Sequence, residues 1–398
     1  MRAPRRARTT LCTAAICGAL PFVVACEESA ASDVGDGGAV ASEEDGGSRI
    51  PTGADAANVD ASPPPAGDAG PDAVDAGPDA SDAPISDLAV TLSATQLVIV
   101  IAGKARTVTS VVSGGKPPYA YTWRVDGAAH AGTVGTLDVG TLPIGDHALT
   151  LDVQDAVGVI RSSAAVPVHV LPTQFDWSHQ LRPSAPPAAG DWLTPVKNQL
   201  SCGSCWAYAA VAAMEARYNI QQNDPNLDVD LSEQDLIDCW TGAVGCGGGA
   251  PEQALDGYVR TKGIPTEVCR PTLGHNDVCK ATCADGSTPA RWKIGAFSFG
   301  PALSDPDRLD WIRDEIVHLG PMARAFEGIY DWNPSTFVCD GGQGSHFVTV
   351  VGYDDVAGHW LLRNSWGPTW NGNGYFETKY GACAVDKGGS TIGAVIPP

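Results

Sequence analysis

Cys205 is the fourth residue of the segment CGSCW at positions 202–206, which leads into a run of small and apolar residues that continues to Met214. This composition predicts a buried helix with Ser204 as its N-cap and Cys205 in its first turn. The partial positive charge at a helix N-terminus favours a thiolate over a thiol. Cys205 is therefore a candidate nucleophile.

Two other kinds of chemistry use cysteines with this spacing. Cys202 and Cys205 could form a redox pair, or they could supply half of a zinc site. Neither interpretation explains the surrounding residues. Gln199, six positions before Cys205, carries an amide that can donate hydrogen bonds to an oxyanion.

A histidine and an asparagine far along the chain provide the remaining polar groups. His346 begins an apolar run at 346–353 that predicts a buried strand. A lone histidine in such a strand is more often structural. A cysteine with a histidine as proton partner, however, can transfer acyl groups through a thioester. Asn364, in the segment NSWG at 364–367, could orient the histidine.

The segment CGSCW matches the signature of papain and the cathepsins. His346 follows Cys205 by 141 residues, inside the range of roughly 130 to 150 that is typical of that family. Other motifs come in the same order, namely LSEQDLIDC at 231–239, GCGGGAP at 245–251 and NSWG at 364–367. Residues 173–398 thus resemble the papain family, which implies an α+β catalytic domain of two lobes with the substrate between them.

The resemblance implies the roles of the polar residues. Cys205 would be the nucleophile and His346 its proton partner. Asn364 would orient the imidazole, and Trp366 would shield that hydrogen bond from water. Gln199 and the backbone N–H of Cys205 would stabilise the oxyanion.

The resemblance also implies a substrate-binding surface, in which a glycine-rich strip pairs with an extended peptide. Its members are Gly248, Gly249, Ala250, Pro251, Ala325, Ser345, Phe347 and Trp366. Three positions depart from the family pattern. Leu200 replaces a usual glycine, Phe347 a usual small residue, and Asn371 a usual glycine after Trp370. These departures leave efficiency and substrate choice open.

Nine of the twelve cysteines lie between positions 202 and 383. In an exported chain this odd number predicts four disulfides and one reactive thiol. The resemblance implies the pairs Cys202–Cys246 and Cys339–Cys383. Cys239 would pair with one of the three remaining cysteines, and the other two would pair with each other; these three are Cys269, Cys279 and Cys283.

Residues 1–25 predict an export signal, since several arginines precede an apolar stretch that is too short to span a membrane comfortably. The sequence VVAC at 23–26 resembles a bacterial lipobox. It predicts a lipid on Cys26 and a membrane anchor in the cell envelope. Glu27 favours the outer membrane, facing either the periplasm or the cell surface. The alternative is an ordinary signal peptide cleaved near Ala25.

Residues 26–87 predict a disordered linker rich in Ala, Asp, Gly, Pro and Ser, because they offer little apolar surface to bury. Positions 27–87 hold fifteen acidic residues against Arg49, and they account for most of the net charge of −21. Such an acidic balance argues against nucleic acid as a partner. The Asp-rich repeats lack the spacing of calcium sites, which favours a solvated spacer.

Residues 88–171 predict an all-β sandwich of roughly seven antiparallel strands, because short alternating runs are separated by Gly and Pro clusters. The segment GGKPPYAYTWRVDG at 114–127 resembles PKD and related immunoglobulin-like modules of bacterial surface proteins. Trp123 is expected in the core. The alternative is a carbohydrate-binding platform made by Trp123 and Tyr121.

The sequence thus predicts a multidomain protein with a papain-like domain at 172–398. The leading hypothesis is a monomeric endopeptidase of polypeptides, tethered to a bacterial envelope, that requires no metal or organic cofactor. One alternative is an exopeptidase in which His275 receives a substrate terminus. The other is a non-catalytic adhesin. Because residues 27–87 show no amphipathic helical pattern, activity is predicted without removal of a propeptide.

Overall fold

The computed structural model describes residues 87–132, 134–187, 190–300 and 304–398. The predicted export signal at 1–25, the predicted lipid site Cys26, and the predicted linker at 26–87 apart from its last residue lie outside these ranges. Within them, no helix is both long enough and apolar enough to cross a membrane.

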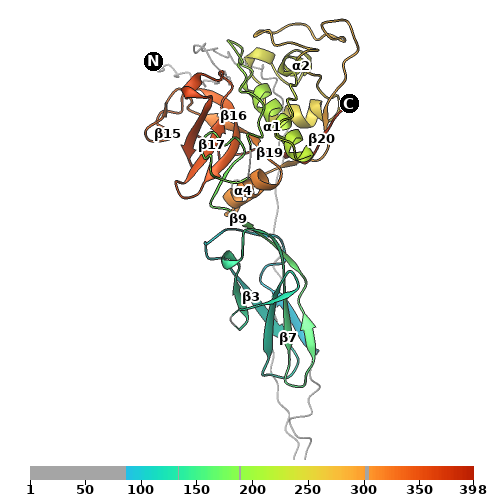
Figure 1. Cartoon of the computed structure of the whole chain (residues 1–398), viewed down its shortest axis with the longest axis vertical. Helices are drawn as coiled ribbons and strands as arrows, with labels where there is room; N and C mark the ends of the chain where they lie inside the picture. Colours follow the sequence, from blue (N-terminus) through green and yellow to red (C-terminus); the bar gives the residue numbers. More distant parts are fainter. Residues whose placement is uncertain (1–86, 133, 188–189, 301–303) are drawn as a thin grey trace, which may run out of the picture. The chain divides into compact units, whose positions relative to one another are not determined.

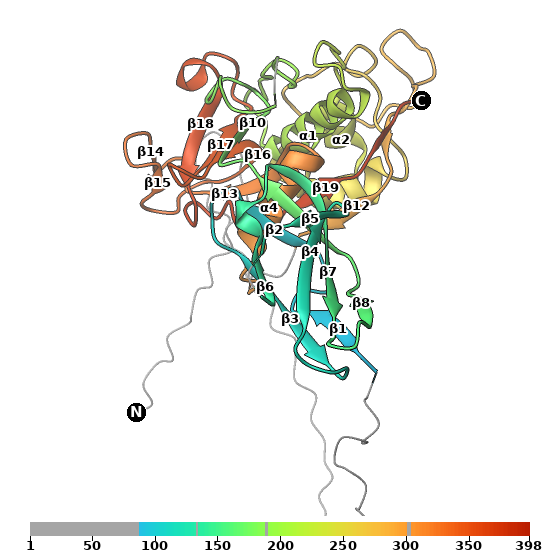
Figure 2. The same cartoon turned by 60° about the horizontal axis from the view of Figure 1, so that its bottom comes forward.

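Residues 88–171 form two sheets (Figures 1 and 2). One has the strand order β1-β3-β6. The other has the order β2-β9-β7-β4-β5, and β8 also pairs with β7. The strands are β1 (Ala89–Leu92), β2 (Val98–Ile101), β3 (Thr107–Ser113), β4 (Ala120–Val125), β5 (Ala128–His130), β6 (Thr136–Asp138), β7 (Gly145–Gln154), β8 (Ile160–Ser162) and β9 (Val166–Leu171).

Alternation along the strands buries one face of each sheet. In β7, for example, Leu149, Leu151 and Val153 are fully buried, and their neighbours are more exposed. Trp123 is 2% exposed in the same core, as expected. The core is therefore built from the alternating apolar positions that the sequence shows.

Two features of these sheets differ from the prediction. The described residues of 88–171 form nine strands where roughly seven were expected, because strands of three residues such as β5 and β8 carry almost no periodic signal. In addition, β2 and β9 pair in parallel, although only antiparallel pairs were expected. Alternation shows which side chains face inward and does not encode the direction of a neighbouring strand.

The region from 172 to 398 combines helices with an antiparallel sheet, as the α+β prediction requires. Helix α1 contacts α2 and α3 on one side and strands β13 and β16 on another. A helix covered on more than one side must pack closely against its neighbours, which favours the many alanines of α1. The helical segments are α1 (Cys205–Gln222), α2 (Glu233–Cys239), α3 (Pro251–Ala254), a π-helical continuation (Leu255–Val259) and α4 (Arg308–His318).

The central sheet has the order β10-β16-β17-β18, and β13 also pairs with β16. Its strands are β10 (Gln174–Asp176), β13 (Met322–Glu327), β16 (Ser345–Asp354), β17 (His359–Arg363) and β18 (Tyr375–Lys379). Three two-stranded sheets complete the region: β11 (Lys293–Ile294) with β20 (Val395–Ile396), β12 (Phe297–Phe299) with β19 (Ser390–Ile392), and β14 (Trp332–Asn333) with β15 (Val338–Cys339).

Four disulfides join pairs of described cysteines in this region. Cys202–Cys246 and Cys339–Cys383 are the pairs that the resemblance implies. Cys239 pairs with Cys279, which leaves Cys269 to pair with Cys283. The choice that the sequence left open is thus resolved by which cysteines lie opposite each other in the loop from 269 to 283.

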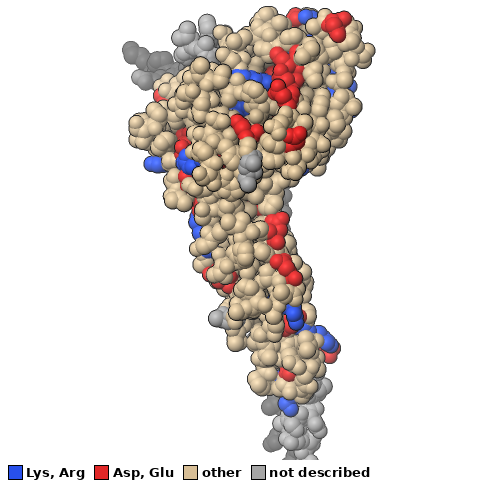
Figure 3. Space-filling view, in the orientation of Figure 1, with Lys and Arg blue, Asp and Glu red and all other residues tan. Residues whose placement is uncertain are grey.

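Acidic side chains gather in patches on the face of the molecule that Figure 3 shows.

Candidate active site

Cys205 is the first residue of α1 and is fully buried. Ser204 occupies the predicted N-cap position, but its side chain makes no capping hydrogen bond. Its backbone, with φ −108° and ψ 17°, lies outside the extended conformation of a usual N-cap, and the hydroxyl lies 3.4 Å from the Cys202 carbonyl. By contrast, Ser232 accepts a hydrogen bond from the Asp235 N–H at the start of α2.

The glycine-rich strip holds the start of α1. The N–H of Gly203 donates to the Cys246 carbonyl at 3.1 Å, and the Trp206 indole donates to the Gly245 carbonyl at 3.1 Å. A Cβ atom on Gly249 would lie only 2.7 Å from the Trp206 ring. This position therefore requires glycine, and the strip is tied to the helix that carries Cys205.

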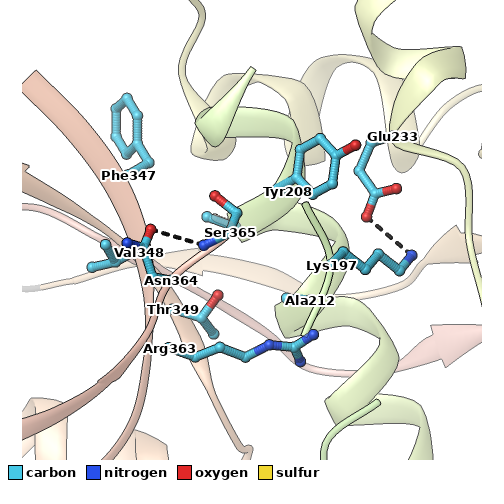
Figure 4. Close-up of a pocket in the computed structure, with 11 residues that line it drawn as sticks. Lys197, Tyr208, Ala212, Glu233, Phe347, Val348, Thr349, Arg363, Asn364 and Ser365 are labelled. Carbon is cyan, nitrogen blue, oxygen red and sulfur yellow. Dashed lines mark hydrogen bonds and ion pairs between the residues drawn. The ribbon is translucent and has the colours of Figure 1, made fainter. Parts of the chain in front are cut away.

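His346 lies at the start of β16 and is 2% exposed. Its Nε2 atom donates to Asn364 Oδ1 at 2.7 Å. The same oxygen accepts the N–H of Ser365 at 2.8 Å, as Figure 4 shows. The Trp366 ring lies 4.8 Å from the imidazole centroid. Asn364 and Trp366 thus contact His346 as orientation and shielding would require.

The surroundings of His346 favour its neutral form. Burial lowers the pKa of His346 to about 4, and the hydrogen bond to Asn364 opposes that shift. The Nδ1 atom is buried and makes no hydrogen bond within the described part of the chain. The imidazole is therefore anchored through one nitrogen, and the other nitrogen remains for proton transfer.

Cys205 and the start of β16 meet directly. The backbone N–H of Phe347 lies 3.3 Å from Cys205 Sγ. Helix α1 also packs along β16. The sulfur consequently lies beside the residue that follows His346, although the two residues are far apart in the sequence.

Gln199 lies between the segment around Cys202 and the segment that contains Asn364. It is 1% exposed. Its Nε2 atom donates to the Cys202 carbonyl at 2.9 Å, and its Oε1 atom accepts the Ser365 hydroxyl at 2.6 Å. Ser365 therefore fixes the amide with its nitrogen toward the loop before Cys205.

A small cavity lies next to these residues, between α1 and the start of β16 (Figure 4). Its lining is Lys197, Tyr208, Ala209, Ala212, Glu233, Phe347, Val348, Thr349, Arg363, Asn364 and Ser365. The Lys197 ammonium lies 2.8 Å from Glu215 and 3.0 Å from Glu233. Burial and neighbouring carboxylates raise the pKa of Glu233 to about 8.

Sequence reasoning missed this charged cluster of Lys197, Glu215 and Glu233. A signal did exist, because Glu215 interrupts the apolar run of α1. A carboxylate at such a position needs a buried partner.

The predicted substrate-binding residues lie on a few segments around the site. Gly248, Gly249 and Ala250 are half-buried in the strip before α3, and Pro251 is the first residue of that helix. Ala325 in β13 pairs with Phe347 in β16, and both side chains are half-buried. Ser345 is the exposed first residue of β16, and Trp366 is half-buried beside His346. Their contact with a peptide remains a prediction.

Two positions that usually carry glycine keep a left-handed backbone. Leu200 has φ 57° and Asn371 has φ 47°. Asn371 gains a hydrogen bond from its side chain to the Tyr375 carbonyl at 2.7 Å. The Leu200 side chain is 55% exposed. The chain therefore retains the turn geometry at both sites with residues that adopt it less easily.

The family model of papain family cysteine proteases matches residues 171–392, which is more than half of the 398 residues. The chain belongs to this family. It is 32% identical over 242 residues to a viral cathepsin of Adoxophyes honmai nucleopolyhedrovirus, covering 58% of this chain and 64% of the relative. It is also 32% identical over 222 residues to the thiol protease aleurain of Arabidopsis thaliana, covering 51% and 59% of the two chains.

Among solved structures, a cysteine protease of Carica candamarcensis is 28% identical and covers 56% of this chain and 99% of its own, with a TM-score of 0.45. The chain spans less than two thirds of the viral and plant relatives. The predicted α+β peptidase domain is thus confirmed by family membership. The relatives are viral and plant proteases, and they give no support to the predicted bacterial tether.

Proposed function

We propose that this protein is a cysteine-type endopeptidase that hydrolyses peptide bonds with Cys205 and His346. The observation that carries the proposal is the contact between the N-terminus of helix α1, which carries Cys205, and the start of strand β16, which carries His346. Cys205 lies at the N-terminus of α1, and its sulfur is 3.3 Å from the N–H of the residue after His346. His346 is in turn anchored to Asn364 at 2.7 Å.

In the first step the Cys205 sulfur forms a bond to the carbonyl carbon of the substrate. The C–N bond then breaks, and His346 gives its Nδ1 proton to the departing amine. In the second step water attacks the thioester and gives a proton to His346, and the carboxylic acid and the Cys205 thiolate are released. Each bond change needs only groups of this chain, the peptide and water.

Gln199 and the first turn of α1 supply the proposed oxyanion donors. Backbone N–H groups at a helix N-terminus have no acceptor within the helix, and Cys205 is the first residue of α1. The Gln199 amide is held toward the same loop by Ser365 and the Cys202 carbonyl. Donors that are already in place lower the barrier without reorganisation.

A thiolate on Cys205 would change the protonation of His346. An opposite charge nearby favours the protonated imidazole, which acts against the burial that lowers the pKa of His346 to about 4. The imidazolium and the N-terminus of α1 would therefore both stabilise the Cys205 thiolate. Trp366, against the imidazole ring, keeps water from competing for the hydrogen bond to Asn364.

Covalent labelling tests this proposal against a non-catalytic adhesin. The purified protein is treated with a peptide carrying an epoxide or vinyl-sulfone group, and the site is located by mass spectrometry. Labelling of Cys205, absent in Cys205→Ala, together with peptide hydrolysis is the expected result. A folded protein that neither reacts nor hydrolyses any peptide in a library would refute the peptidase function.

A second comparison separates endopeptidase from exopeptidase action. His275, the residue that could receive a substrate terminus, is exposed, and its Nδ1 atom lies 3.0 Å from the Leu273 carbonyl. We expect peptides with both ends blocked to be cleaved internally, and His275→Ala to leave their cleavage unchanged. Cleavage that requires a free terminus and depends on His275 would favour the exopeptidase.

The N-terminal parts are proposed to tether the peptidase. We infer a lipid on Cys26 at the end of a signal at 1–25, a linker at 26–87, and a PKD or immunoglobulin-like spacer at 88–171, in a monomer at a bacterial outer membrane. The two sheets of residues 88–171 support the spacer. Cys26→Ser should release the protein from membranes and preserve peptidase activity, and unchanged fractionation would count against lipidation.

Activity is proposed to need no removal of an inhibitory segment. The test compares the protein that begins at Cys26 with one that begins at Pro172. Equal rates of peptide hydrolysis are expected. If the longer protein is inert until it is cut near Pro172, the preceding sheets or their junction inhibit the enzyme.

A further inference from the structure

Two histidines outside the proposed active site meet where β7 and β9 adjoin helix α4. His169 lies in β9, Asp146 in β7, and His318 is the last residue of α4. The potential metal-ligand atoms of these three residues all lie within 4.8 Å of one another. The proposed peptidase mechanism uses none of them.

Asp314, also in α4, holds both imidazole rings from one side. Its Oδ1 atom lies 2.7 Å from Nδ1 of His169 and 3.0 Å from Nδ1 of His318. The Asp314 carbonyl is 2.9 Å from the same His318 nitrogen. The rings lie with their centroids 4.4 Å apart. Because both Nδ1 atoms are engaged on this side, the Nε2 atoms are the ones that remain for a ligand.

Both Nε2 atoms face Asp146. The Asp146 Oδ1 atom lies 2.9 Å from Nε2 of His318 and 3.8 Å from Nε2 of His169. Ligand atoms bound to a tetrahedral zinc ion at about 2.1 Å are about 3.4 Å apart. The two observed distances lie on either side of that value, and all three ligand atoms lie within 4.8 Å of one another. Rotation of the side chains that brings the two Nε2 atoms closer together would complete the site.

We propose that Asp146, His169 and His318 bind a zinc ion, with water as the fourth ligand and Asp314 orienting both histidines. Histidines that bind metals usually donate their other ring N–H to a carboxylate or carbonyl, which is the arrangement that Asp314 makes. Two imidazoles and one carboxylate suit zinc, whereas calcium and magnesium prefer oxygen ligands.

Solvent reaches the site, since the side chains of Asp146, His169 and His318 are 62%, 22% and 30% exposed. Asp146 and His169 belong to the sheets of residues 88–171, and His318 belongs to the peptidase region. A bound ion would therefore cross-link the two regions. The ion pair of Lys104 with Asp355 also joins these two regions. A bound zinc ion would add to this link and would raise the stability of the folded chain by mass action.

Zinc titration of the full chain tests the proposal in a Cys205→Ala background, because the Cys205 thiolate with His346 could otherwise take up zinc. Calorimetry should show one equivalent of zinc bound and no calcium binding, and the thermal midpoint should rise with zinc. His169→Ala and His318→Ala should each weaken binding at least tenfold. Asp314→Asn should weaken it about 10- to 100-fold although it removes no ligand.

His147→Gln is the matched control. His147 follows Asp146 in β7, but its ring bonds to Asp126 at 2.8 Å and to the Pro143 carbonyl at 2.9 Å. Successive side chains of a strand point to opposite faces, so this variant should bind zinc as its parent does. Circular dichroism without metal checks that every variant is folded.

Cobalt(II) absorption provides a second measurement. A four-coordinate spectrum is expected with the parent and not with His318→Ala. The proposal is overturned if zinc does not bind to the Cys205→Ala chain, or if folded His169→Ala and His318→Ala bind it equally well. The four residues then form only an ion-pair network. Neither result depends on peptidase activity.

Discussion

His346 Nε2 donates to Asn364 Oδ1 at 2.7 Å, and this bond determines which imidazole nitrogen is left for chemistry. With Nε2 anchored, Nδ1 is the atom available to exchange a proton with Cys205 or a substrate. The ring is buried, so its protonation depends on the charge of its neighbour. The hydrogen bond to Asn364 therefore orients the imidazole so that Nδ1 is the nitrogen that can transfer a proton.

We predict that the pKa of His346 depends on the Cys205 thiolate. Without the thiolate, burial sets the pKa to about 4, so in Cys205→Ala the imidazole should be neutral near pH 6. A thiolate should raise this pKa in the parent, because opposite charges stabilise each other. NMR titration of the His346 ring in both proteins measures the difference.

Linkage gives this prediction an independent check. In the unfolded chain the pKa of His346 has its ordinary value of about 6.5. In the folded Cys205→Ala variant the pKa is about 4. That variant should therefore lose stability as the pH falls from 6.5 toward 4, in proportion to the difference in bound protons. Equal pKa values of His346 in the two proteins would contradict the ion pair.

A second prediction concerns the buried carboxylate of Glu233. In the folded protein its pKa is raised to about 8, above the value of about 4.3 in the unfolded chain. The folded state therefore holds this proton more tightly, and stability should decline as the pH rises from about 4.3 to 8. Glu233→Gln keeps an oxygen for Lys197 and removes the titration. The variant should lose less stability between pH 5 and 9, by up to about 4 kcal/mol, because each pH unit below the folded pKa contributes about 1.4 kcal/mol.

Urea unfolding at several pH values measures the effect. Asp256→Asn is the control, because Asp256 is a partly exposed carboxylate paired with Arg260 at 2.7 Å, and pairs near the surface contribute little. A pH profile of Glu233→Gln parallel to that of the parent would show that another group carries the dependence.

These residues also show what the sequence can and cannot predict. Cys205, His346 and Asn364 could be assigned because each belongs to a short local motif, and the motifs have a fixed order. The cluster of Lys197 with Glu233 could not, because a charge in a sequence resembles a surface residue until the folded chain covers it.

The same limit applies to contacts between distant segments. The zinc-site residues are isolated in the sequence, and no motif connects Asp146 with His318. Strand β2 pairs with β9 in parallel. The alternation of apolar and polar residues does not encode the relative direction of two strands that are far apart in the sequence. Ser204 shows a finer limit, because a residue type favoured at an N-cap does not ensure the backbone angles of a cap.

A third prediction concerns the left-handed backbone at Leu200, with φ 57°. A side chain in this conformation costs on the order of 1 kcal/mol, so Leu200→Gly should stabilise the fold by up to about 1 kcal/mol despite the added flexibility of the unfolded chain. Leu200→Ala keeps the Cβ atom and should give no gain. Asn371→Gly should also give none, because it loses the bond to the Tyr375 carbonyl.

Denaturant midpoints under conditions that keep the disulfides intact measure these three variants. If the backbone at Leu200 is strained, the denaturant midpoint of Leu200→Gly lies above that of the parent, and the midpoint of Leu200→Ala lies at or below it. A gain in Leu200→Ala equal to that in Leu200→Gly would trace the effect to the exposed side chain and not to the backbone.

The last prediction treats the catalytic residues as a unit. Cys205→Ala should abolish turnover, since it removes the atom that bonds to the substrate. His346→Ala should do nearly the same, because it removes the proton donor and the partner of the thiolate. The double variant should be no worse than either single one, because neither residue works without the other.

Gln199→Ala and Asn364→Ala should instead be partial. Loss of one oxyanion donor costs about 100- to 1,000-fold in rate with little effect on binding, so Gln199→Ala should retain measurable activity. Ser365→Ala is its matched partner, because it removes only the hydroxyl that holds the Gln199 oxygen, and it should lose less. In Asn364→Ala the pair of Cys205 with His346 persists but is oriented less well.

The measurement is kcat/KM on one peptide for all these variants, after each is shown to be folded. The order expected is Ser365→Ala, then Gln199→Ala and Asn364→Ala, then Cys205→Ala and His346→Ala with no detectable rate. If Asn364→Ala is as inactive as Cys205→Ala, orientation is indispensable and the ion pair cannot form alone. If Gln199→Ala equals the parent, the oxyanion is stabilised by other donors, and the role of Gln199 is wrong although the family assignment stands.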